Sequence, residues 1–130
     1  MSLFSDDFAV YIKDNNLQNG MQVYIDFSPA KVNYISVFTT GGYGRDNTLD
    51  ALTSIEEPTL QVAVAHKNST VAKDTLQAIN DFIQDKSNVV IGEHLYTLFS
   101  SQGDILYLSR DDDNRAKYVL NIRTIRIKNT

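Results

Sequence analysis

The amino-terminal part of the chain switches from a helical to a strand-like hydrophobic pattern. Four apolar residues recur at the spacing of one helical face: Phe4, Phe8, Tyr11 and Ile12. This spacing predicts a short helix, with Ser2 or Ser5 as its cap. Apolar and polar residues then alternate over 21–27, and 32–39 forms a second strand-like segment. We therefore expect two strands, joined as a hairpin by the turn-forming sequence Ser28-Pro29-Ala30-Lys31.

The alternation disappears between residues 40 and 57, which begin with a glycine-rich run. Long loops inside small domains are usually functional or disordered. We expect a flexible loop over about residues 40–57 that becomes ordered against a neighbouring molecule, with Tyr43, Arg45 and Asp46 as candidate contacts. Its run Gly41-Gly42-Tyr43-Gly44-Arg45 lacks the Gly-Lys-Ser/Thr ending of a phosphate-binding loop.

A strand and a long helix are predicted in the middle of the chain. Apolar residues alternate strictly after Pro58, which indicates a strand that ends near His66. The sequence Asn68-Ser69-Thr70 then offers caps for a helix with a continuous apolar stripe. That stripe consists of Val71, Ala72, Leu76, Ile79, Phe82 and Ile83. We expect this helix to lie across the sheet.

Three more strands are predicted after this helix. Strands at 95–99 and 105–108 are expected to form a hairpin around Gly103. In the last strand, which follows residue 117, the apolar residues change from even to odd positions: Leu120, Ile122, Ile125 and Ile127. A β-bulge near Arg123 and Thr124 would keep these residues on one face.

These elements predict an α+β fold, with two helices packed on a mainly antiparallel mixed β-sheet. The chain has 130 residues, of which 42% are hydrophobic, so we expect a single domain over residues 1–130. Its amino terminus does not have the basic flank of a signal peptide, and no apolar run is long enough for a membrane span. The absence of cysteine removes disulfides and thiolate metal sites from consideration.

Charge is distributed unevenly along the chain. The net charge of -4 argues against a protein whose main task is to coat nucleic acid. Six basic residues nevertheless fall in the last stretch: Arg110, Arg115, Lys117, Arg123, Arg126 and Lys128. Because the first half is rich in acids, faces of opposite sign could meet in a homo-oligomer. The alternative is a solvated strand edge on which the basic side chains prevent aggregation.

Candidate chemistry is sparse. His66 and His94 have no second ligand at a spacing used by metals, and the histidines have no recognisable nucleophile context. The run Asp111-Asp112-Asp113-Asn114 does not continue as a calcium loop, so a polar turn stabilised by its own Asp and Asn side chains is the preferred interpretation. We therefore expect no enzyme, no cofactor and no metal site.

Two segments carry a family resemblance. They are Glu57-Pro58-Thr59-Leu60-Gln61-Val62-Ala63-Val64, and Arg110-Asp111 through Arg115 into the strand Tyr118–Ile122. Together with the order of elements along nearly the whole chain, these segments resemble the tail terminator and minor capsid proteins of long-tailed bacteriophages. The chain departs from the family where Ser109 replaces a frequent glycine and His66-Lys67 stands at a frequent arginine.

The resemblance implies a structural role rather than turnover. Proteins of this family form a ring, typically a hexamer, that stops growth of the tail tube and joins the tail to the head connector. The expected partners are further copies of the chain, the tail tube protein and a head-completion or connector protein, with no membrane and no specific nucleic acid. The expected location is the neck of the virion, assembled in the cytoplasm of the bacterial host.

The resemblance also places Arg110, Asp111 and Arg115 on the intersubunit or tube-facing surface. Charge reversal at Arg115 is then expected to block ring formation and to leave the melting of the fold largely unchanged. The loop residues Arg45 and Asp46, with Tyr43, form the second expected contact surface.

Two other functions stay open from the sequence alone. One is a head-completion or neck connector protein of the same virion, which shares the small size and the α+β content. The other is a small ligand-binding or nucleic-acid-binding module with an aromatic platform beside Lys31 and Arg45. That platform would consist of Tyr24, Tyr34, Phe38 and Tyr43.

Overall fold

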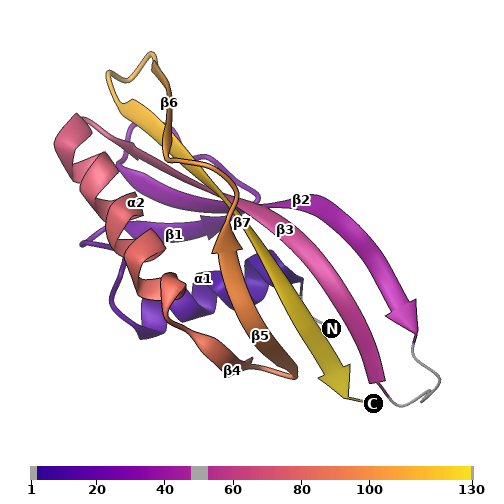
Figure 1. The fold of residues 1–130 in the computed structure, drawn as a ribbon. Coiled ribbons are helices and arrows are strands. Elements are labelled where there is room, and N and C mark those ends of the chain that lie inside the picture. Colours follow the sequence, from indigo (N-terminus) through magenta and orange to yellow (C-terminus); the bar gives the residue numbers. More distant parts are fainter. Residues whose placement is uncertain (1–2, 48–52, 130) are drawn as a thin grey trace.

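A strongly curled mixed sheet forms the frame of the computed structural model, which describes residues 3–47 and 53–129 (Figure 1). Within those residues the sheet has seven strands in the order β1-β2-β3-β7-β5-β4, and β6 pairs separately with β7. The strands are β1 (Gln22–Ile25), β2 (Tyr34–Asn47), β3 (Thr53–His66), β4 (Ser87–Ile91), β5 (His94–Ser101), β6 (Leu106–Arg110) and β7 (Ala116–Asn129). The helices are α1 (Phe4–Asp14) and α2 (Ser69–Gln84).

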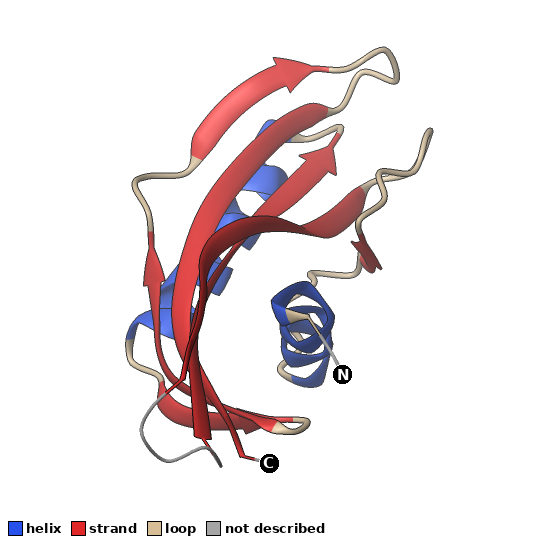
Figure 2. Ribbon diagram, turned by 90° about the vertical axis from the view of Figure 1, so that its right-hand side faces the viewer, coloured by secondary structure: helices blue, strands red, loops and turns tan. Residues whose placement is uncertain are grey.

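Both helices pack on the same face of the sheet, and α1 lies in its concavity (Figure 2). This inner face presents even-numbered residues of β3 and β7, such as Leu60, Val62 and Leu120. The rings of Tyr11 on α1 and Phe82 on α2 approach to 5.7 Å between centroids. The predicted α+β class, with two helices on a mainly antiparallel mixed sheet, is therefore confirmed.

The helix ends differ in how they are capped. Asn68 caps α2 as expected, because its Oδ1 accepts hydrogen bonds from the N–H groups of Thr70 and Val71. The serine cap expected for α1 is wrong at Ser5, which lies inside the helix and is fully buried. Leu3 occupies the cap position, and its N–H donates to Asp6 Oδ2 at 2.9 Å. Ser2 lies outside the described residues.

The hairpin predicted for residues 21–39 is wrong. β1 runs parallel to β2, with Gln22 opposite Tyr34 and Ile25 opposite Val37. The connecting segment 26–33 leaves β1 at Asp26, where φ is +54°, and travels back before β2 begins. The Ser36 hydroxyl donates to the Phe27 carbonyl at 2.5 Å and so ties this segment to β2.

The loop predicted over residues 40–57 is also wrong for most of its length. Residues 40–47 belong to β2 and 53–57 to β3, and the two strands pair antiparallel. A register shift between Thr39 and Gly41, where φ is +109°, lets the strand pass through its glycine run. These residues thus form strands through backbone pairing although their sequence does not alternate between apolar and polar residues. The expected flexibility of this segment stays a prediction. Residues 48–52 lie outside the described part.

The hairpin expected at 95–108 is wrong as well, since β5 and β6 do not pair with each other. Both strands pair antiparallel with β7, β5 along its second half and β6 along its first half. The chain moves from one to the other along the same edge of β7, where the Gln102 N–H donates to the Asn121 carbonyl at 2.8 Å. β4, which was not predicted, pairs with β5.

The β-bulge expected in the last strand lies in its neighbour instead. β7 keeps one register with β3 from Thr53–Asn129 to His66–Ala116, whereas β5 shifts register between Tyr96 and Leu98. Even positions of β7 therefore continue to face inward, and Thr124 and Arg126 are buried there. Ile125 and Ile127 face the opposite side of the sheet.

Candidate functional site

The turn between β6 and β7 is built by Asp111. Its Oδ1 accepts hydrogen bonds at 3.0 Å from the N–H groups of Asp113 and Arg115, and its own N–H donates to the Arg115 carbonyl at 2.9 Å. Asn114 supplies the left-handed residue of the turn, with φ of +61°. The expected polar turn is confirmed.

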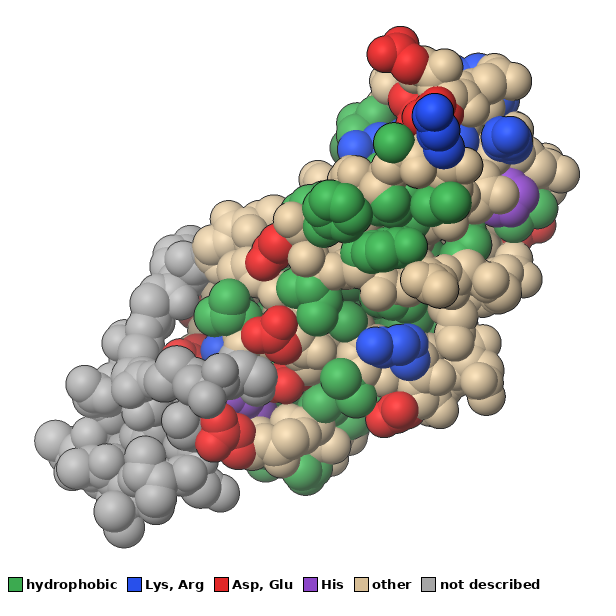
Figure 3. Space-filling model, turned by 180° about the vertical axis from the view of Figure 1, so that it is seen from behind, with side chains coloured by type: hydrophobic (Ala, Val, Ile, Leu, Met, Phe, Trp, Pro, Cys, Tyr) green, Lys and Arg blue, Asp and Glu red, His purple; other side chains and the backbone are tan. Residues whose placement is uncertain are grey.

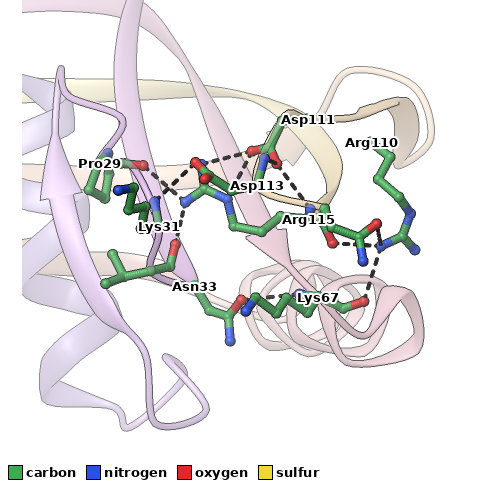
Figure 4. A network of polar contacts seen from close by, with 10 residues as sticks. Pro29, Lys31, Asn33, Lys67, Arg110, Asp111, Asp113 and Arg115 are labelled. Atoms are coloured by element: carbon green, nitrogen blue, oxygen red, sulfur yellow. Dashed lines mark hydrogen bonds and ion pairs between the residues drawn. The ribbon is translucent and has the colours of Figure 1, made fainter.

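Arg115 joins this turn to the segment 26–33 (Figure 4). Its guanidinium is paired with Asp111, with Nε and Nη2 each 2.8 Å from Oδ2. Nη1 donates to the carbonyls of Pro29, at 2.9 Å, and Val32. The guanidinium also lies over the Tyr34 ring, 5.0 Å from its centroid. Arg115 is thus a structural clamp between two distant segments.

The position of Arg115 differs from the expectation that it lies on an intersubunit or tube-facing surface. The residue is only 5% exposed, so its side chain is not part of the free surface of the subunit. Burial acts to raise the pKa of Asp111, but the hydrogen bonds and charge of Arg115 outweigh this effect and bring the pKa below its usual value. Because of these contacts we expect charge reversal at Arg115 to destabilise the fold, in contrast to the unchanged melting expected from the sequence.

Arg110 lies at the exposed side of the same turn. Its Nη1 donates to the Asn114 carbonyl at 2.7 Å and to the carbonyl of Lys67, which precedes the cap of α2, at 3.3 Å. Charged side chains gather at this end of the molecule, at the top of Figure 3, whereas hydrophobic side chains lie over the middle of that face. Contact of Arg110 or Asp111 with a neighbouring subunit stays a prediction.

The two groups of predicted contact residues are not brought together. Tyr43, Arg45 and Asp46 lie in the part of β2 that pairs with residues 55–57 of β3. The 110–115 turn lies beside His66, at the other end of β3. At about 3.3 Å per strand residue, the two groups are roughly 30 Å apart along β3. They would contact different neighbours or different parts of one neighbour.

A buried polar cluster on the inner face was missed by the sequence analysis. It consists of the buried Asp7 on α1, His94 and Tyr96 on β5 and Arg126 on β7, together with the partly buried Glu56 on β3. The Tyr96 hydroxyl donates to Asp7 Oδ2 at 2.5 Å, and His94 Nδ1 lies 3.1 Å from the same oxygen. Arg126 donates from Nε to Glu56 at 2.8 Å and from Nη1 to the Tyr96 hydroxyl at 3.2 Å.

This cluster ties α1 to three strands. Burial, and next the hydrogen bond to Asp7, raise the pKa of Tyr96 far above its usual value. Each of the two carboxylates faces a donor from another element, as buried charges require. The signal that could have revealed the cluster is positional, because Thr124 and Arg126 continue the even series of Leu120 and Ile122.

β6 is an exposed edge strand with unusual composition. Leu106, Tyr107 and Leu108 are 52%, 55% and 51% exposed, respectively. In the described part of the chain β6 pairs with β7 on one side only. A row of unpaired backbone groups beside exposed apolar side chains is a template for contact with another chain.

Other kinds of site have less support. Within residues 3–47 and 53–129, no group of three or more histidine or carboxylate side chains is placed to hold a metal ion. The aromatic platform considered above is interrupted, because Tyr34 is only 2% exposed beneath Arg115. No helix in the described residues has the length and apolar composition needed to cross a bilayer.

Comparison with known proteins identifies one family. The model of a family described as bacteriophage tail terminator protein matches residues 10–126. That range includes all of the strands except the end of β7, all of α2 and the second half of α1. A search of curated proteins finds no match.

Proposed function

Since the chain belongs to the bacteriophage tail terminator family and is therefore a structural protein of the phage tail, we propose that it forms a ring that caps the tail tube. The ring is expected to be hexameric, to stop tube growth and to join the tail to the head connector. The observation that carries this proposal is the family match over residues 10–126. The exposed edge strand β6 supports it, because a ring requires a surface that a lone subunit leaves uncovered.

The proposed mechanism is stoichiometric binding. Around a closed cyclic axis, each subunit contacts one neighbour with one surface and the other neighbour with a different surface. The completed ring then meets the open end of the tube and a head-completion or connector protein on its other side. Assembly would take place in the cytoplasm of the host, and the ring would remain in the virion neck.

The direct test is the length of tail tubes. Purified tube protein would be polymerised with and without this protein, and tube lengths would be measured by electron microscopy. We expect uniform, shorter tubes with a ring at one end when the protein is present. Unchanged lengths, together with binding to isolated head connectors, would instead identify a neck protein that plays no part in termination.

Self-assembly can be measured in the same preparation. Sedimentation velocity over a wide concentration range should show a discrete species near six protomers, or a monomer that assembles only when tubes are added. A protein that stays monomeric and leaves tube ends bare would contradict the proposed function.

A further inference from the structure

The outer face of the sheet, opposite the helices, carries an apolar surface at the end where β4 lies. It consists of Ile55, Val90, Leu95, Leu98, Ile125 and Ile127, and we name it the apolar ladder. Val90 is 71% exposed and Leu98 40%. The other four side chains are partly buried, and no helix packs on this face of the described sheet.

Strand register makes the ladder continuous. Ile127 lies opposite both Ile55 on β3 and Leu95 on β5, and Leu95 lies opposite Val90 on β4. One row of directly paired apolar residues therefore crosses four strands. Leu98, opposite Ile125, begins the next row. The four strands lie side by side in the lower half of Figure 1.

Polarity is inverted across this part of the sheet. The inner face, buried under α1, holds the charged residues Glu56 and Arg126 together with His94. The outer face holds the isoleucines and leucines of the ladder. In a chain that acted alone the apolar side chains would gain more by facing inward. A contiguous apolar surface left outside in this way marks an interaction site.

A second surface on the same chain complements the ladder. β6 presents Leu106, Tyr107 and Leu108, and its five residues extend over about 17 Å. The row of the ladder spans four strands, which are about 14 Å across between the outer strand axes. The exposed Asp104 precedes β6, and Arg123 borders the ladder on the outer side of β7. The two surfaces thus match in length, apolar character and charge.

We propose that the apolar ladder of one subunit receives β6 of a second copy of this chain. The contact is heterologous, because the two surfaces are different and lie on different parts of the molecule, so every subunit gives its β6 to one neighbour and receives the β6 of the other. The inference rests on the proposed ring and identifies the surfaces that close it. A stable interface buries about 800 Å² on each partner, which is more than one strand and one row of side chains cover. β6 and the ladder therefore form the apolar centre of a larger interface between subunits.

Cysteine cross-linking tests the contact directly, because the chain contains no cysteine. Two single variants, Leu98→Cys in the ladder and Leu106→Cys in β6, would be purified with different tags, mixed and oxidised. Disulfide formation requires Cα atoms within about 7 Å. A third variant, Val10→Cys, serves as the matched control because Val10 is 44% exposed but lies on α1.

Only the mixture of Leu98→Cys and Leu106→Cys should give disulfide-linked dimers that carry both tags. Each variant alone, and either one mixed with Val10→Cys, should remain uncross-linked. A variant that carries both cysteines should form chains up to the size of the ring. It cannot close the bond within one subunit, because the partners of the two positions on β7, Val119 and Ile125, are about 20 Å apart.

Other outcomes overturn the inference in distinguishable ways. Cross-linked dimers from Leu106→Cys alone would show that β6 pairs with β6, which forms a two-fold dimer and no ring. Rings of wild-type protein without mixed cross-links would overturn this interface and leave the proposed function intact. Mixed cross-links without any effect on tube length would support the interface and contradict tube termination. The melting curves of all three variants should match that of the wild type, which confirms that each one is folded.

Discussion

Replacing Arg115 by methionine should destabilise the subunit strongly. Methionine keeps an apolar stem over the Tyr34 ring but cannot replace the guanidinium, which bonds to Asp111 and to the carbonyls of Pro29 and Val32. The segment 26–33 would lose its attachment to the 110–115 turn. A buried carbonyl and a carboxylate would be left without their charged donor.

The size of the effect follows from burial. Breaking a buried ion pair by removing one partner costs about 3–5 kcal/mol. Because the side chain of Asp111 is 27% exposed and water can rehydrate it in part, we take the lower end, about 3 kcal/mol. For a domain of this size that corresponds to a fall in melting temperature of about 10 °C. The loss is a large part of the roughly 5–15 kcal/mol that stabilises an ordinary domain.

Urea unfolding and thermal melting, followed by circular dichroism, would measure the change. Arg115→Lys keeps the charge but not the fork of donors, so it should restore less than half of the lost stability. Arg110→Met is the matched control in the same turn, and its effect should stay within about 1 kcal/mol because Arg110 is exposed. A wild-type melting curve for Arg115→Met would refute the assignment of Arg115 as a structural clamp.

Three further predictions concern other polar contacts. The stabilising effect of Asp111 is measured as the difference in unfolding free energy between wild type and Asp111→Asn, and it should be present at neutral pH and disappear in acid. The pKa of Asp111 is lowered in the folded state. Its contribution to stability is therefore complete above about pH 4 and is lost as the pH falls through the folded-state pKa. Tyr96→Phe, which removes the hydroxyl that binds Asp7, should cost about 1–3 kcal/mol in urea unfolding. Asn68→Ala, which removes the cap of α2, should cost about 1 kcal/mol in the same assay.

Each of these predictions has a result that would contradict it. A difference between wild type and Asp111→Asn that persists unchanged at pH 2 would show that the carboxylate charge is not what stabilises the turn. Unchanged stability of Tyr96→Phe would mean that the buried cluster does not depend on its central hydroxyl. Equal helix stability in Asn68→Ala, measured by hydrogen exchange in α2, would rule out the side-chain cap.

Local patterns in the sequence determined the elements that depend on near neighbours. The apolar stripes of α1 and α2 fix which helix faces are buried, since residues three and four apart share one face. The Asp111 turn and the Asn68 cap also form between residues at most four positions apart. The general class, helices on a mainly antiparallel sheet, followed from these patterns together with the alternation after Pro58.

Strand partners were decided only by the tertiary structure. Nothing within residues 21–39 states that β1 runs parallel to β2, because the segment between them is held by Arg115, more than eighty positions away. β5 and β6 were expected to pair with each other, but β7 offers one continuous edge that accepts both. Hydrogen bonds between strands join residues far apart in the chain, so alternation reveals a strand but not its neighbour.

The buried polar cluster and the apolar ladder could not be predicted for the same reason, because both depend on which strands become neighbours. Sequence reasoning placed Ile125 and Ile127 on the same inward face as Leu120 and Ile122, through a β-bulge near Arg123 and Thr124. The structure instead buries Arg126, because Glu56 and Tyr96 arrive from other strands to satisfy its charge and hydrogen bonds. The chain alone thus predicted both helices, the Asp111 turn and most strand segments, but not β4 or the continuation of β2 and β3 through residues 40–47 and 53–57. Which face of β7 is inside was decided by partners up to seventy residues distant, since only their arrival makes a buried arginine stable.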